Sequence, residues 1–327
     1  MFKETPLVLH FMAAILLVFV LPIVVPSNVL ATEILIFALA AIGCNLLLGY
    51  TGLLSFGQAL FFGAGAYIAS LMSIHWTIDL LSILLITVFL GGAIAIVVGY
   101  FSIRRHGIYF VMLTLAFAQL GYYIAYLAEP ITGGEDGLLD VHRPALVIPF
   151  LAKFHFGNDL SFYVLVAVIF VLMFTLMQRL VSSPFGSVLV AIKQNEARAE
   201  AIGYQVRLYK IAVFAFSGAI TALSGALYAF MLNFAPLSNI DIETSEHILF
   251  MCVLGGLGSL YGSIVGTIIF LLSSEMLAEL WPRWMLLLGV LLIVVMLYLP
   301  GGVWKAITDF FERLFGKKNK EKGGKHV

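Results

Sequence analysis

The run LLSILLITVFLGGAIAIVVGY, residues 80–100, contains 21 consecutive residues without a charged side chain. A helix needs about 20 mostly apolar residues to cross the hydrocarbon core of a bilayer. The same character extends along the chain, because 62% of its 327 residues are hydrophobic and 11% are charged. Soluble domains carry about 25% charged residues. The sequence therefore predicts an all-α, polytopic transmembrane helical bundle.

Nine apolar regions are candidates for membrane spans. Seven are continuous runs, whereas the other two, 52–73 and 246–280, are rich in glycine. The region 246–280 is too long for one helix and is interrupted by GGLGS at 255–259, which predicts two crossings, 246–256 and 260–280. We therefore expect about ten spans in total. The seven continuous runs are 7–26, 30–48, 79–101, 108–128, 162–181, 210–232 and 284–300.

The distribution of basic residues supports a helix break at Gly255, Gly256 and Gly258. With this break both termini lie on one side of the membrane, and 15 of the 18 Lys and Arg residues fall on that side. A single crossing over 246–280 would move the basic C-terminal tail to the other side. Because Lys and Arg concentrate on the cytoplasmic side of membrane proteins, we expect both termini in the cytoplasm.

Two loops and a tail lie outside the expected spans. We assign residues 1–304 to a transmembrane domain, with an outer loop at 129–161 and a polar cytoplasmic segment at 182–209. Residues 305–327 form a basic cytoplasmic tail ending in GKKNKEKGGKHV. Its composition predicts a disordered, solvated tail that helps to set the topology.

The cytoplasmic stretch SSPFGSVLVAIKQNEARAEAIGYQVRLYK, residues 182–210, is expected to form an amphipathic helix over about 185–202. Ser183 and Pro184 suit the start of a helix, and Gly203 suits its end. Such a helix is suited to enter a groove on a partner protein or to lie in the lipid headgroup plane. Its mixture of Glu and Arg favours the protein partner. The apolar face consists of Phe185, Val188, Leu189 and Ile192.

A second informative stretch is GYTGLLSFGQALFFGAGAY, residues 49–67, and LGGLGSLYGSIVGT at 254–267 resembles it in composition. Glycines in membrane helices permit close packing or a break in the helix, and Ser55 and Gln58 place polar groups near membrane depth. Interrupted segments in the two halves of a transporter often mark the substrate path, so Ser55, Gln58 and Tyr67 are candidate path residues. Tight helix packing without a ligand is the alternative explanation.

Motifs for catalysis or energy conversion are missing from the sequence. It contains no Walker A run, no H-E-x-x-H and no G-x-S-x-G. Cys44 and Cys252 lie in apolar runs, which argues against a disulfide or a zinc site. Apart from acids at the ends of the spans, Glu33 and Glu275 are the only acids expected inside spans, whereas proton-coupled carriers often have several. We therefore expect no catalytic residue, metal, cofactor or nucleic-acid partner. A secondary carrier or channel remains an alternative because of the glycine-rich breaks.

Five motifs resemble, in the same order, the LivM branch of the branched-chain amino acid permeases, which are membrane subunits of ATP-binding-cassette importers. The resemblance covers roughly residues 30–300. It implies branched-chain amino acids as the solute, with urea or short-chain amides as the alternative. The motifs are GYTGLLSFGQALFFGAGAY at 49–67, RRHGIYFVMLTLAFAQL at 104–120, TGGEDGL at 132–138, AIKQNEARAEAIGY at 191–204 and SGALYAF at 224–230.

This resemblance also implies a fold and a set of partners. The fold is the all-helical one of the vitamin B12/ribose-type importers. The partners are a second, homologous permease subunit, two ATPase subunits and a periplasmic solute-binding protein, assembled at the bacterial inner membrane. Residues 191–204 match the family's cytoplasmic coupling loop. The residues implied to contact the ATPase or to shape this loop are Glu196, Ala197, Arg198 and Gly203.

Overall fold

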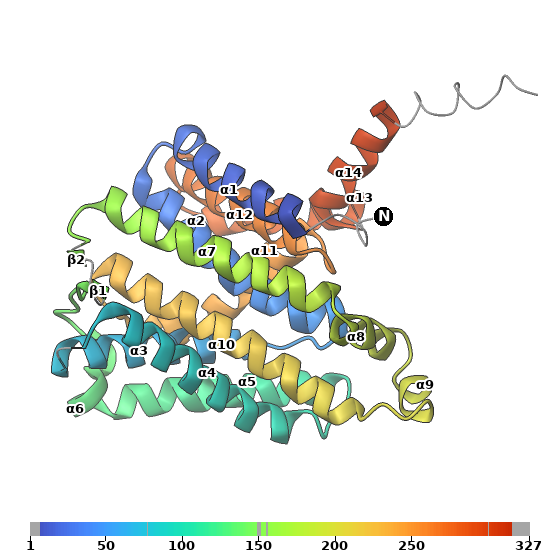
Figure 1. The fold of residues 1–327 in the computed structure, drawn as a ribbon, viewed down its shortest axis with the longest axis horizontal. Helices are drawn as coiled ribbons and strands as arrows, with labels where there is room; N and C mark the ends of the chain where they lie inside the picture. The colour runs from blue at the N-terminus through green and yellow to red at the C-terminus, as the bar shows by residue number, and fades with distance from the viewer. Residues whose placement is uncertain (1–6, 77, 149–151, 155, 300, 316–327) are drawn as a thin grey trace, which may run out of the picture.

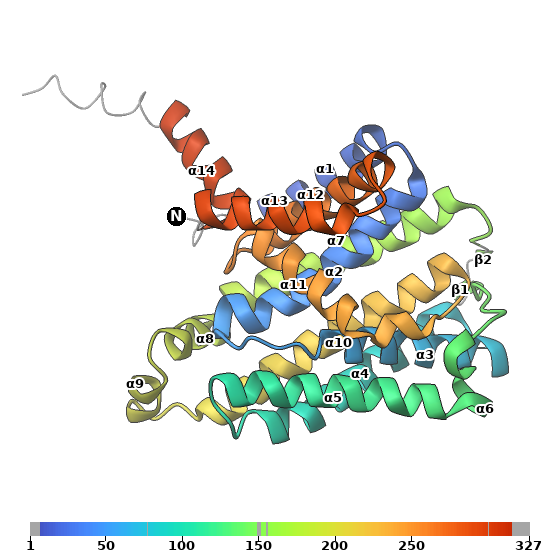
Figure 2. The ribbon, with the colours of Figure 1, turned by 180° about the vertical axis from the view of Figure 1, so that it is seen from behind.

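The computed structural model describes residues 7–76, 78–148, 152–154, 156–299 and 301–315, which form one bundle of helices (Figures 1 and 2). The polytopic helical fold is confirmed, with one short hairpin of strands in addition. The α-helices are α1 Leu7–Val24, α2 Asn28–Asn45, α3 Gln58–His75, α4 Leu80–Ser102, α5 Ile108–Leu127, α6 Glu129–Thr132, α7 Asp159–Ser182, α8 Pro184–Gln194, α9 Glu196–Ala201, α10 Val206–Leu232, α11 Ile242–Gly255, α12 Leu260–Leu280, α13 Trp284–Tyr298 and α14 Gly302–Phe315. The remaining elements are the π-helix η2 Leu46–Thr51, the 3₁₀ turns η3 Gly134–Asp136 and η4 Leu237–Ile240, and the strands β1 Leu146–Ile148 and β2 Ala152–Phe154.

Helix α2 lies at the centre of the bundle. Its side chains are almost all buried, and it packs against α7, α10, α11 and α12. Ser27 caps its first turn by accepting a hydrogen bond from the Leu30 amide at 3.1 Å. The small residues of ALAAIG, at 38–43, let neighbouring helices approach its backbone. A helix that is apolar on every side is expected to be buried in this way.

Glycines set the close packing of α10 against α3 and α4. A Cβ atom at Gly225 would lie 1.8 Å from the Phe62 carbonyl oxygen, and one at Gly65 would lie 1.9 Å from that of Ala222. Backbone-to-backbone contact of this kind provides much of the van der Waals attraction between helices in lipid. The packing explanation therefore holds for Gly65, within the glycine-rich stretch 49–67.

The expected spans all correspond to helices, but their lengths differ from expectation. Within the described residues, six helices are long and apolar enough to cross a membrane, or up to seven if the bent pair of α13 and α14 counts as one span. The stretch 52–73 becomes helical only at Gln58, and α11 has 14 residues. The count of ten spans stays a prediction.

The C-terminal region departs from the expectation of disorder. Residues 302–315 form helix α14, so the expectation is wrong for 305–315, where apolar residues recur three or four positions apart and favour an amphipathic helix. The rest of the predicted tail, 316–327, lies outside the described residues.

The loops are segregated to two ends of the bundle (Figure 1). Helices α8, α9 and α14 and the beginning of α1 lie at one end, and α6, β1 and β2 lie at the other. This arrangement puts the basic segment 182–209 and the start of the basic tail together. It is the segregation that the distribution of Lys and Arg predicts.

The packing of α10 yields a first testable prediction. Substituting Gly225→Ala should destabilise the protein by about 1–3 kcal/mol, because the added methyl group must displace the backbone of α3. The matched control is Gly289→Ala in α13, where an added methyl group meets nothing within 4 Å among the described residues. Thermal unfolding in detergent, followed by size-exclusion chromatography, measures both variants. Equal midpoints for the two would contradict the packing argument.

Candidate translocation path and coupling site

Helix α3 begins in the interior of the bundle, not at its surface. The chain leaves η2 at Gly52 and runs as an irregular segment to Gln58 (Figure 2). The Gln58 side chain donates to Ser217 Oγ at 3.2 Å and accepts from Thr221 Oγ1 at 2.9 Å. Both partners lie in the middle of α10, a helix of 27 residues. Helix α3 therefore starts about halfway across the bundle.

Helix α11 also begins in the interior, against the first turn of α3. Ser245, in the first turns of α11, accepts a hydrogen bond from the Ala59 amide at 2.8 Å and donates to the Phe56 carbonyl oxygen at 2.7 Å. The two shortened helices thus meet at their N-terminal ends. Interrupted helices that meet inside a bundle are associated with the substrate path of transporters.

The motif TGGEDGL holds the chain that leads into α11. Leu138 and Ala235 exchange both backbone hydrogen bonds, each at 3.0 Å. Gly137 has φ +71°, and a Cβ atom there would lie 2.5 Å from the Ala235 carbonyl oxygen. A glycine is therefore required at this contact. The motif fixes the segment after α10 at the end of the bundle that carries α6, β1 and β2.

Helix α5 adjoins the irregular segment and exposes most of its own surface. Thr114 Oγ1 accepts a hydrogen bond from the Phe56 amide at 3.3 Å. Along the same helix Gln119 is half-buried and Tyr123 is 58% exposed. The neighbouring residues 52–54 are exposed or half-buried. Irregular backbone at membrane depth is tolerated where it faces protein or water, but not where it faces lipid. This side of α5 therefore suits an aqueous path or a second subunit.

The three candidate path residues are buried and do not converge on one open cavity. Ser55 Oγ accepts from the Gly57 amide at 3.1 Å, and Gln58 is bonded to α10 as described above. Both residues fasten the start of α3. The Tyr67 hydroxyl lies about two and a half turns further along α3. It is buried and has no hydrogen-bond partner within the described part of the chain. Contact of these residues with the solute stays a prediction.

The coupling segment is a pair of helices, so the expectation of one helix over 185–202 is wrong. Helix α8 ends at Gln194 and α9 begins at Glu196. Between them Asn195 is extended, with φ −161° and ψ 101°, and its side chain accepts from the Arg198 amide at 2.9 Å. An Asn in this position caps the second helix and competes with continuation of the first. Gly203, with φ +97°, closes α9 in the manner expected of a C-terminal glycine.

The apolar face of α8 is covered by the protein itself. Val188 and Ile192 are buried against Val206 and Tyr209 of α10. The expectation that this face enters a groove on the ATPase is therefore wrong. Other apolar groups are exposed at this end of the bundle. Ile202 is 70% exposed beside the exposed Ala197 and Arg198. An exposed apolar group in an aqueous loop suits contact with a partner protein.

Glu196 makes an ion pair within the chain. Its Oε1 lies 2.6 Å from Nζ of Lys210, whose side chain is 5% exposed near the start of α10. Its Oε2 lies 3.8 Å from Nδ1 of His106, in the connection between α4 and α5. Glu196 thus holds α9 against two other elements, and its contact with the ATPase stays a prediction. The sequence offers no sign of the Lys210 partner, 14 residues away.

Asn45, four residues before the first glycine-rich stretch, binds the second one, and sequence reasoning missed it. Its side-chain nitrogen donates to the Ser259 carbonyl oxygen at 2.8 Å and to Ser263 Oγ at 2.7 Å, and its oxygen accepts from the Gly258 amide at 2.9 Å. Helix α11 ends at Gly255 and α12 begins at Leu260, so the chain is interrupted where the sequence predicts. The only signal for this contact in the sequence is a single Asn within the apolar run 30–48.

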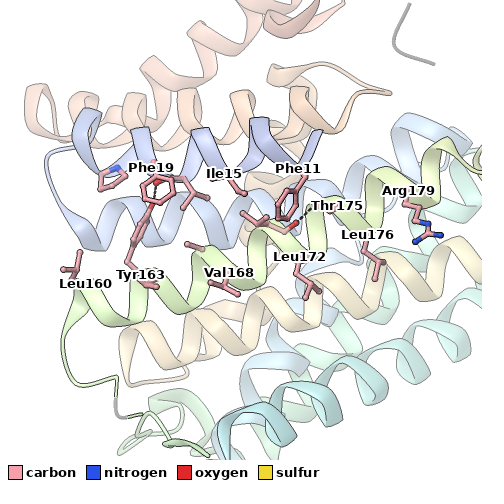
Figure 3. Close-up of a pocket in the computed structure, with 15 residues that line it drawn as sticks. Phe11, Ile15, Phe19, Leu160, Tyr163, Val168, Leu172, Thr175, Leu176 and Arg179 are labelled. Carbon is pink, nitrogen blue, oxygen red and sulfur yellow. Dashed lines mark hydrogen bonds between the residues drawn. The ribbon is translucent and has the colours of Figure 1, made fainter. Parts of the chain in front are cut away.

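A groove of about 830 Å³ lies between α1 and α7 (Figure 3). Apolar side chains such as Phe19 and Val168 line it, and Arg179 lies at one end. Its hydroxyl groups are already satisfied, because Tyr163 donates to the Val18 carbonyl oxygen and Thr175 to that of Val171. The groove has no group to hold both ends of an amino acid, so it suits hydrocarbon and not the solute.

The ion pair of Glu196 predicts a local effect on stability. Substituting Glu196→Ala leaves the buried Lys210 without its carboxylate, which should cost about 1–2 kcal/mol because the carboxylate is partly exposed. Amides of α9 should then exchange hydrogen roughly 5–30 times faster. The control is Glu200→Ala, at an exposed position of the same helix. Unchanged exchange in the Glu196 variant would show that the pair does not hold α9.

Comparisons with known proteins identify the family of the chain. The family described as "Branched-chain amino acid transport system / permease component" matches residues 27–296. The high-affinity branched-chain amino acid transport system permease protein LivM of Escherichia coli (strain K12) is 26% identical over 292 residues, covering 84% of this chain and 69% of the relative. The probable LivM protein of Methanocaldococcus jannaschii is 23% identical over 317 residues, covering 82% and 90%.

A sugar permease is also related. The ribose import permease protein RbsC of Haemophilus influenzae is 26% identical over 303 residues, covering 87% of this chain and 90% of the relative. No solved structure gives a significant match. The family pattern covers most of the chain, including the interrupted helices and the coupling segment. The chain therefore belongs to the family of branched-chain amino acid transport system permease components.

Proposed function

We propose that this chain is one of two permease subunits of an ATP-driven importer and carries branched-chain amino acids delivered by a periplasmic binding protein. The observation that carries the proposal is the meeting of α3 and α11 in the interior beside the exposed face of α5. The relatives named as LivM support the choice of solute. Urea and short-chain amides are the alternative solutes.

The second permease subunit is proposed to cover the α5 side of the bundle. The irregular residues 52–54 are exposed or half-buried, and non-helical backbone at membrane depth is unsuited to lipid, whereas a homologous subunit would enclose a path between the two chains. Gln119 and Tyr123 of α5 would then line this path, with the first turns of α3 and α11 behind them. Such a lining combines an aromatic ring with a few polar groups, which suits an amino acid that has an apolar side chain.

The ATPase subunits are proposed to bind the end of the bundle that carries α8 and α9. Ala197, Arg198 and Ile202 are exposed there, and Gly203 shapes the turn that presents them. Glu196 contributes by holding α9 in place. This end would lie in the cytoplasm of a bacterial cell, together with both termini, because it gathers the basic segments of the chain.

Transport by the reconstituted complex tests the solute. The chain is assembled with its second permease subunit, ATPase and binding protein in vesicles, and uptake of labelled leucine is measured. We expect ATP-dependent uptake that isoleucine and valine inhibit and that urea, acetamide and ribose do not. Uptake inhibited by urea instead would support the alternative solute, and leucine uptake by the lone chain without ATP would support a secondary carrier.

Cysteine labelling tests the orientation. A Glu135→Cys variant should react with a membrane-impermeant maleimide in intact cells, whereas an Ala201→Cys variant should react only after the cells are opened. Both positions are exposed, and the native Cys44 and Cys252 are buried, so the background is low. The reverse pattern of labelling would place α8 and α9 outside the cell and exclude them as the ATPase site.

A further inference from the structure

Two side chains join the coupling segment to the interruption between α11 and α12. Lys193, in the last turn of α8, donates from Nζ to the backbone carbonyl oxygen of Gly49 at 2.7 Å. Gly49 lies in the π-helix η2, about one turn after Asn45. Asn45 in turn holds Gly258 and Ser259. Hydrogen bonds at Gly49 and Asn45, joined by one turn of helical backbone, therefore connect α8 through the end of α2 to the turn between α11 and α12.

The contacts along this connection are close enough to transmit a displacement. A Cβ atom at Gly49 would lie 1.8 Å from Asn45 Oδ1 and 2.5 Å from the Gly258 amide nitrogen. The backbone of η2 is thus in direct contact with the turn, without an intervening flexible side chain. Close-packed elements of this kind shift together because they are barely compressible.

The π-helix ends in a shared hydrogen bond. The Gly52 amide, which ends it, donates to both the Leu47 and Leu48 carbonyl oxygens. The first bond is of the π type and the second of the α type, so a small movement of the carbonyl groups can favour either one. Gly52 also begins the irregular segment that leads to Gln58. A change of bonding in η2 therefore reaches the start of α3.

We propose that Lys193 and Asn45 are positioning residues that transmit movement of α8 and α9 to the α11–α12 turn and to the start of α3. This proposal rests on the proposed function, because it takes the ATPase to bind α8 and α9. Neither residue is required to touch the solute. The charge of Lys193 makes its bond to Gly49 stronger than one between neutral groups. Asn45, fully buried with three bonds, fixes the other end of the connection.

The first test compares uptake with ATP hydrolysis in the reconstituted complex. Substituting Lys193→Met keeps the aliphatic stem and removes the donor, so leucine taken up per ATP hydrolysed should fall about tenfold. ATPase binding, measured by co-purification, should be unchanged. Gln194→Met, at the next exposed position of α8, should retain the wild-type ratio, and Lys193→Arg should restore most of it. A wild-type ratio in the Lys193→Met variant would overturn the proposal.

The second test does not depend on the solute. Spin labels at Leu257→Cys, in the turn, and Leu81→Cys, on α4 near the opposite end, report movement of the turn. We expect ATP to change this distance in the wild-type background and to leave it unchanged with Lys193→Met or Asn45→Ala. Movement of the turn in both variants would overturn the proposal. If the wild type takes up no leucine but ATP still moves the turn, the proposed solute is wrong and the role of Lys193 and Asn45 still stands.

Discussion

Backbone groups at membrane depth must find their hydrogen-bond partners within the protein, because lipid offers none. Continuous helices meet this requirement by themselves, but α3 and α11 begin inside the bundle and leave their first amides without helical partners. Side chains from other elements supply what is missing. Ser245 and Thr114 bond the backbone around Phe56, and Asn45 bonds the turn after α11. The interrupted architecture is stable because these polar residues are placed at the interruptions.

The same polar residues determine which elements can move together. Between continuous helices the contacts are apolar and rest on small residues, as at Gly225 and Gly65. At the interruptions the contacts are directional hydrogen bonds that join particular pairs of elements. Glu196 joins α9 to α10, Lys193 joins α8 to η2, and Asn45 joins the end of α2 to the α11–α12 turn. Rigid helices that are linked by a few specific bonds suit a protein that must alternate between conformations.

The sequence predicts the helical segments and the helix break, because the length of an apolar run and the positions of its glycines are local properties of the chain. It does not predict the partners of Asn45, Gln58 or Lys210. Those partners depend on which helices become neighbours, and Asn45 and Gly258 are separated by 213 residues. The apolar face of α8 was identified correctly but assigned to the wrong partner. Amphipathic spacing shows that a face is covered, and only the fold shows that α10 covers it.

The short length of α11 has a consequence for how the protein is made. Its 14 residues extend about 21 Å, less than the roughly 30 Å of hydrocarbon in a bilayer. Alone in lipid, its beginning and the irregular chain before it would lack hydrogen-bond partners. Ser245 finds its partners at Phe56 and Ala59, which leave the ribosome almost 190 residues earlier. Biosynthesis is therefore ordered, because the first half of the chain must already be inserted to receive the shortened helix of the second.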